Sequence, residues 1–63
     1  MMAYQIEDQN GNQPKDARLW EEAINAFEKD KTWFEFNGQD VLIIEAKKID
    51  TDVTIIVEME EVL

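Results

Sequence analysis

The 63-residue sequence contains no cysteine, no histidine and no serine. Nucleophilic catalysis by serine or cysteine with a histidine base is therefore excluded, and so is proton transfer by histidine. Disulfide bonds cannot stabilise the chain, and structural zinc is disfavoured because its preferred ligands are cysteine and histidine. The two glycines, Gly11 and Gly38, lie far apart in separate turn-like segments, so there is no glycine-rich phosphate loop.

The groups that remain for chemistry are carboxylates, lysines, threonines and one tyrosine. Paired carboxylates can hydrolyse glycosides, but that mechanism needs a substrate cleft and one carboxyl group held protonated. The segment 50–52 resembles the start of a calcium-binding loop, yet the glycine that such a loop needs at its sixth position is missing. We therefore expect a protein that is not an enzyme and that binds neither a cofactor nor a metal.

Acidic residues are in large excess, with 15 Asp and Glu against 6 Lys and Arg, so the formal net charge is -9. This charge disfavours direct binding to nucleic acid or to anionic membranes, which both require basic side chains. It favours a protein partner with a basic surface. The longest apolar run, 41–44, is far shorter than the ~20 residues of a membrane span, and residues 1–8 do not resemble a signal peptide. We therefore expect a cytoplasmic protein.

The length of the chain is compatible with one domain, residues 1–63. A chain of this size buries only about 60% of the surface that its unfolded form exposes, so its stability is expected to be marginal. Disulfides, metals or a second subunit commonly support small folds, and the composition disfavours the first two. The composition therefore also suggests that two copies of the chain form a homodimer.

The chain divides into one helical and several extended segments. The loop 10–14 contains Asn, Gly and Pro and separates a first short strand from the helix. We predict an α+β fold in the order β-α-β-β-β, with one helix packed on one face of a small antiparallel sheet. The predicted ranges are 3–7 for the first strand, 14–29 for the helix, and 31–36, 41–49 and 53–59 for the remaining strands, with residue 62 as the alternative end of the last strand.

The helical segment has one apolar stripe. Trp20, Ala23, Ile24 and Phe27 recur at the spacing of one helix face, with Ala17 and Leu19 beside them. We predict that this stripe packs on even-numbered residues of the strand 41–49, because Glu45 and Lys47 occupy its odd-numbered side. The residues expected beneath the helix are Leu42, Ile44, Ala46, Val53, Ile55 and Val57.

The dipeptide Asn37-Gly38 is a strong signal for a two-residue hairpin turn. Such a turn pairs Phe34 with Val41 and Trp33 with Leu42, and paired residues share a face. Trp33 is then expected beneath the helix. The uncovered face receives an apolar patch that is typical of an interface, made of Phe34, Phe36, Val41 and Ile43, with Ile56 as a further candidate.

Two alternatives to this exposed patch remain open. A bulged turn at Asn37-Gly38 would move Phe34 to the helix side, because one extra residue reverses the faces of a strand. The N-terminal segment or the C-terminal Val62 and Leu63 would otherwise cover part of the patch.

Several carboxylates accompany the predicted patch. The predicted register places Glu35 opposite Asp40, and like charges in that position are mildly destabilising. Glu58 and Glu60 are two residues apart on one face of a strand, about 6.7 Å, which is about twice the phosphate spacing along one DNA strand.

We expect a small acidic protein-binding module, in its sharpest form an inhibitor that mimics nucleic-acid phosphates and covers a basic surface of a nucleic-acid-processing enzyme. The alternative is a non-enzymatic structural protein that forms homo-oligomers through an exposed sheet face or through the edge strand 53–59. The predicted binding residues are Phe34, Phe36, Val41 and Ile43 for apolar contacts and Glu35, Asp40, Glu58 and Glu60 for charged contacts.

Overall fold

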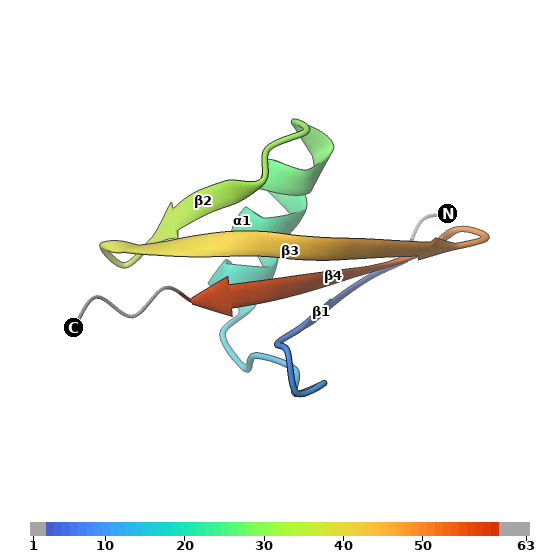
Figure 1. Ribbon diagram of the computed structural model, residues 1–63, viewed down its shortest axis with the longest axis horizontal. Coiled ribbons are helices and arrows are strands. Elements are labelled where there is room, and N and C mark those ends of the chain that lie inside the picture. The colour runs from blue at the N-terminus through green and yellow to red at the C-terminus, as the bar shows by residue number, and fades with distance from the viewer. Residues whose placement is uncertain (1–2, 60–63) are drawn as a thin grey trace.

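One helix and four strands make up the part of the chain that the computed structural model describes, residues 3–59 (Figure 1). The element order confirms the predicted α+β arrangement of one helix on a small sheet. The predicted ranges agree with the structure to within about three residues at each end. The elements are β1 (Ala3–Glu7), α1 (Ala17–Glu28), β2 (Trp33–Phe36), β3 (Gln39–Ile49) and β4 (Asp52–Met59).

The sheet has the strand order β1-β4-β3-β2, so β4 lies in its interior and β1 and β2 form its two outer strands. Strands β2, β3 and β4 pair antiparallel, as predicted, whereas β1 pairs parallel with β4. The sheet is therefore mixed rather than purely antiparallel. The prediction that the segment 53–59 is an edge strand is wrong, because β4 has a hydrogen-bonded neighbour on each side.

Helix α1 begins at Ala17, three residues later than predicted, because Asp16 is its N-cap. The backbone of Asp16 is extended, and its side-chain Oδ1 accepts a hydrogen bond from the backbone N–H of Arg18 at 2.9 Å. This bond satisfies one of the N–H groups that the first turn leaves unpaired. The Trp20 indole Nε1 donates to the Pro14 carbonyl at 2.7 Å, which attaches the preceding loop to the helix.

The C-terminus of α1 is closed by two backbone hydrogen bonds. The N–H of Lys31 donates to the Ala26 carbonyl at 2.9 Å, and the N–H of Asp30 donates to the Phe27 carbonyl at 3.1 Å. This is the pattern of a Schellman motif. The position that glycine usually occupies in that motif is taken by Asp30, whose φ is 58°. The chain therefore turns toward β2 through a left-handed residue that carries a side chain.

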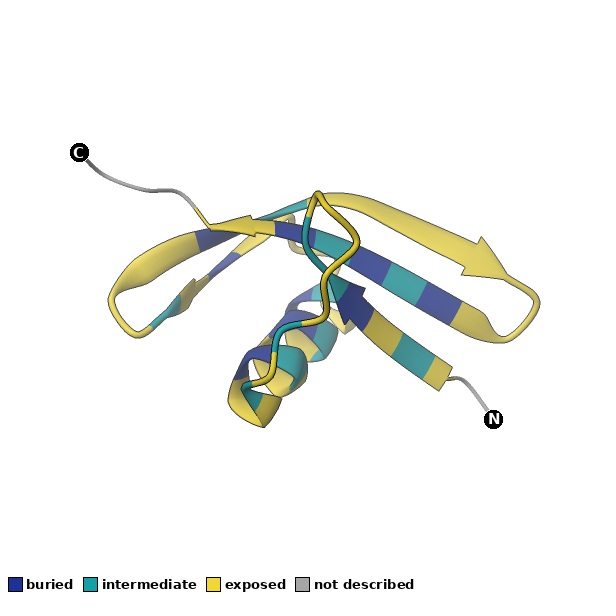
Figure 2. Cartoon of the chain, turned by 90° about the horizontal axis from the view of Figure 1, so that it is seen from below, coloured by how far each residue is buried: buried dark blue, intermediate teal, exposed yellow. Residues whose placement is uncertain are grey.

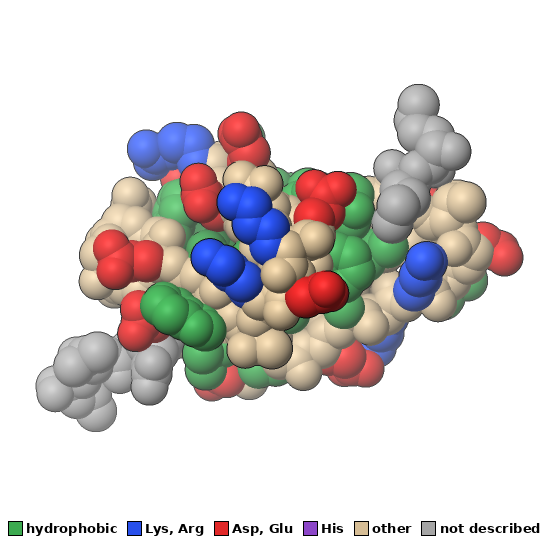
Figure 3. All heavy atoms as spheres, turned by 90° about the horizontal axis from the view of Figure 1, so that it is seen from above, with side chains coloured by type: hydrophobic (Ala, Val, Ile, Leu, Met, Phe, Trp, Pro, Cys, Tyr) green, Lys and Arg blue, Asp and Glu red, His purple; other side chains and the backbone are tan. Residues whose placement is uncertain are grey.

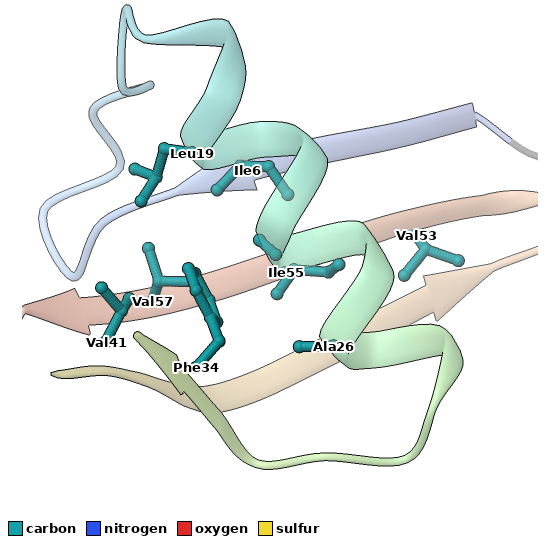
Figure 4. Packing of buried hydrophobic residues seen from close by; sticks show 9 residues of the cluster. Ile6, Leu19, Ala26, Phe34, Val41, Val53, Ile55 and Val57 are labelled. Atoms are coloured by element: carbon teal, nitrogen blue, oxygen red, sulfur yellow. The ribbon is translucent and has the colours of Figure 1, made fainter. Parts of the chain in front are cut away.

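The core lies between α1 and one face of the sheet (Figure 4). Three helix residues spaced four and three apart, Leu19, Ala23 and Ala26, are buried against it. The predicted stripe residues Trp20, Ile24 and Phe27 pack beside this line and are only half-buried. Small alanines at the closest approach let the helix axis come near the sheet. The sheet contributes the buried side chains of Ile6, Phe34, Val41, Val53, Ile55 and Val57.

The hairpin between β2 and β3 has the predicted two-residue turn. Asn37 and Gly38 both have positive φ, 51° and 78°, which is the requirement of a type I′ turn. The register pairs Trp33 with Leu42 and Phe34 with Val41, as predicted. The alternative of a bulged turn at this position is therefore excluded.

An irregularity lies instead in the middle of β3. Ile43 pairs with Val57, but Glu45 rather than Ile44 pairs with Ile56, so Ile44 is an extra residue opposite β4. This is a β-bulge, and it reverses which residues of β3 point to each face. Before the bulge the odd-numbered residue Val41 faces the helix, and after it the odd-numbered Glu45 faces away.

Replacing Asp30 with glycine should stabilise the protein. Glycine adopts a left-handed backbone without the steric cost that a side chain incurs, and the D30G change also removes a negative charge from the negative end of the helix dipole. We expect a gain of about 0.5–1 kcal/mol in the free energy of unfolding, measured with urea. D30A is the matched control, because it removes the same charge and keeps the strained conformation. Equal stability of the two variants would contradict the conformational explanation.

The Asp16 cap should make stability depend on pH. The Arg18 side chain, and then the Arg18 backbone N–H, donate to the Asp16 carboxylate and lower its pKa from the ordinary 3.8. A lowered pKa in the folded state gives stability that is present above pH 3.8 and is lost as the pH falls through the folded-state value. The D16N variant should therefore be less stable than the unmodified chain at pH 7, and the difference should shrink below pH 3.8. The D16A variant lacks the cap as well and should stay less stable at every pH, as thermal unfolding would show.

Candidate interaction surface

The helix covers only one face of the sheet. In Figure 1 the strands lie in front of α1, and no described segment lies in front of the strands. We call the covered side the inner face and the other side the outer face. Buried residues alternate with half-buried ones along β4 (Figure 2). The buried Val53, Ile55 and Val57 belong to the core on the inner face, so Thr54 and Ile56 point to the outer face.

The apolar residues predicted for the outer face lie on the inner face. Phe34 is 7% exposed and Val41 is fully buried, and both belong to the core. Phe36 and Ile43 are half-buried and pack against the same core. The prediction that these side chains form an exposed binding patch is therefore wrong, although the hairpin register on which it was built is confirmed.

The bulge at Ile44 explains the error. The charged Glu45 and Lys47 do point to the outer face, as assumed, because they pair with Ile56 and Thr54. Extending that alternation backwards through a regular strand puts Leu42 inside and Val41 outside. One inserted residue reverses this assignment, so all side chains before the bulge change faces.

A different apolar group therefore occupies the outer face. Trp33 is 52% exposed and pairs directly with the half-buried Leu42. Leu42 pairs in turn with Glu58 on β4, and the half-buried Ile56 is the next residue of β4 on the same face. We call Trp33, Leu42 and Ile56 the outer apolar cluster. The bulge residue Ile44 is 46% exposed next to it in β3.

Carboxylates surround the outer apolar cluster. Glu35 and Asp40 are exposed and pair directly, as predicted, and Glu58 is exposed beside Leu42. Glu60 lies outside the described residues. The register places three further carboxylates on this face; Glu45 was assigned to it from the sequence, whereas the position of Glu7 depends on the parallel β1–β4 pairing. These are Glu7, Glu45 and Asp52, and Lys47 is the one basic side chain among the described residues of this face.

The acidic character is a property of this face rather than of every side of the molecule. The view of Figure 3 looks onto a different side, and there lysine and arginine side chains lie between aspartates and glutamates. Arg18 illustrates the pattern, because it forms an ion pair with Asp16 at 3.2 Å and lies over the Phe36 ring at 5.7 Å from its centroid. Carboxylates that have such neighbours are less available to a basic partner.

The remaining polar groups have structural roles. The backbone N–H groups of Asn10 and Asn12 both donate to the Asp8 Oδ1 at 2.8 Å, and these bonds, that from Asn12 first, lower the pKa of Asp8. Burial and the nearby Glu28 carboxylate raise the pKa of Tyr4, whose hydroxyl donates to Glu28 at 3.5 Å. Within residues 3–59, no group of three or more acidic side chains has the geometry of a metal site.

Two surface hollows are open to solvent, and Leu42 and Ile56 of the outer apolar cluster line neither of them. One is lined by the loop after β1 and the end of β4, including Asn10, Pro14 and Met59. The other lies beside the segment that leads into β2, next to Asp30, and the outer-face residues Trp33 and Glu35 line one side of it. The outer face is therefore an open surface that suits a protein partner better than a small molecule.

Comparisons with known proteins supply no relative. No protein-family model, no curated protein and no solved structure matches the chain. No helix in the described part of the chain is long and apolar enough to cross a membrane.

The assignment of Phe34 to the inner face and Trp33 to the outer face can be tested by truncating each aromatic side chain. Phe34→Ala removes a buried ring and should lower the free energy of unfolding by about 3–5 kcal/mol. Trp33→Ala removes a larger but half-exposed ring and should cost less than about 1 kcal/mol. Chemical denaturation of both variants measures the difference. A larger loss for Trp33 than for Phe34 would contradict the face assignment.

Proposed function

We propose that this chain is a protein-binding module whose outer face covers a basic surface on a partner protein. The observation that carries the proposal is an exposed tryptophan beside a leucine, on a sheet face that no described segment covers and whose charged groups are nearly all carboxylates. Tryptophan is enriched at the energetic centres of protein interfaces. Carboxylates at the rim of such a centre select a basic partner and accelerate its approach.

The spacing of the carboxylates favours a partner that ordinarily binds phosphates. Glu35 and Asp40 lie side by side on neighbouring strands, and Glu58 lies one row further along the sheet. Directly opposed residues of like charge weaken a sheet, so an exposed Glu35–Asp40 pair has a cost in stability. A basic partner would offset that cost on binding. We therefore propose, as the sharper form, that the module competes with nucleic acid for the basic surface of a nucleic-acid-processing enzyme.

A charge-matched pair of variants tests the proposal. The double variant E35Q,E58Q removes two outer-face carboxylates, whereas E21Q,E22Q removes two exposed carboxylates from the helix. Immobilised chain should retain basic proteins from a heparin-binding fraction of a cell extract at low salt. We expect E35Q,E58Q and W33A to lose at least tenfold of that retention, and E21Q,E22Q to lose less than twofold.

The nucleic-acid part of the proposal has its own readout. Fluorescence anisotropy of a labelled DNA or RNA bound to each retained protein should fall when the unmodified chain is added, and should fall less as salt increases. Equal retention by the two double variants would contradict the outer-face proposal. Retention without displacement of nucleic acid would contradict only the phosphate-mimic form.

A further inference from the structure

The sheet has a free edge in the middle of the fold, distinct from the outer face. β2 pairs with β3 only as far as Leu42, and the last bond on that side runs from the Ile43 N–H to the Thr32 carbonyl at 2.8 Å. Beyond this bond, residues 45–49 of β3 pair with β4 alone among the described residues, and the bulge residue Ile44 lies between them and Ile43, so that residues 44–49 have no neighbour on the side of β2. All six are exposed, and Figure 2 shows this end of β3 extending past α1. Strand edges of this kind readily pair with another strand.

In a solution of the purified chain, a second copy is the strand that this edge meets. Two copies that meet through the same edge and a two-fold axis run antiparallel and keep their outer faces on the same side. Only residues of one face can then lie opposite each other. After the bulge, Glu45, Lys47 and Ile49 belong to the outer face and Ala46 and Lys48 to the inner face.

Few registers satisfy this condition. In each of them one residue lies opposite the same residue of the second copy, and we call the register centred on that residue. A register centred on Ala46 would put Ile49 of the second copy opposite Ile43, where Thr32 already lies. The next register is centred on Lys47 and the following one on Lys48. A register centred on Ile49 leaves too little strand to pair, because the turn begins at Asp50, whose φ is 55°.

Each of the two remaining registers places like charges opposite each other. The first puts the Lys47 ammonium groups of both copies together on the outer face, and the second does the same for Lys48 on the inner face. Juxtaposed like charges at an interface cost several kcal/mol. We propose that Lys47 and Lys48 together prevent this edge from pairing with a second copy. The free edge of β3 at residues 44–49 therefore stays unpaired, although its backbone is able to bind another strand.

Single substitutions at position 47 test the proposal by oligomeric state. K47T removes the repulsion and puts two β-forming threonines opposite each other, so it should associate at least tenfold more tightly than the unmodified chain in sedimentation experiments. The K31T control loses the same charge from the loop before β2 and should not change association. K47E restores repulsion with the opposite sign and should stay unpaired by this edge.

A mixture gives the sharpest result. Equal amounts of K47E and the unmodified chain place a carboxylate opposite Lys47, so we expect a mixed dimer that neither protein forms alone. Hydrogen exchange in that dimer and in K47T should show new protection of those backbone amides of residues 44–48 that point away from β4. Protection of these amides in the unmodified chain alone would overturn the proposal, and so would the absence of association both in K47T and in the mixture. The test does not involve the outer-face carboxylates, so its outcome is independent of the proposed function.

Discussion

The fold depends on the change of face that the bulge introduces into β3. A regular strand that buried Val41 and Ile43 would also direct Glu45 and Lys47 to the inner face beside Ile55. A charged side chain that loses water without a partner is costly. The extra residue at Ile44 lets the first half of the strand contribute to the core while Glu45 and Lys47 remain on the outer face. The burial of Phe34 follows from the same change, since it is the direct partner of Val41.

Local sequence signals predicted the elements and one register well. The Asn37-Gly38 turn, the helix that follows the loop 10–14 and the alternation in β4 are short-range features, and each depends on only a few neighbouring residues. The faces of β2 and of the first half of β3 were inverted, because a face assignment extends along the whole strand from a single residue whose face is chosen. The residues 41–44 are all apolar and carry no alternation that could have marked the bulge. The parallel pairing of β1 with β4 also lacked a local signal, because it joins segments from opposite ends of the described chain.

The candidate surface was predicted in part. The alternation in β4 correctly placed Glu58 on the outer face. The hairpin register correctly predicted that Glu35 pairs with Asp40, but their outer position follows from the bulge, which the sequence did not indicate. Its apolar part was misidentified: Trp33 and Leu42 replace Phe34 and Val41. The general expectation behind it holds for the described residues, since a single helix of 12 residues leaves the opposite side of a four-stranded sheet open to solvent.

The parallel ladder between β1 and β4 has a consequence for how the molecule is assembled. Helix α1 and the β2–β3 and β3–β4 hairpins can form from neighbouring residues, whereas the pairing of Ile6 with Ile55 requires closure of a loop that contains all of them. Such a closure has a high entropic cost until the intervening segments have condensed. Attachment of the first strand is therefore the natural last step of folding. Its release is the natural first step of opening, which would uncover the β1 side of β4 before any other interior part of the sheet.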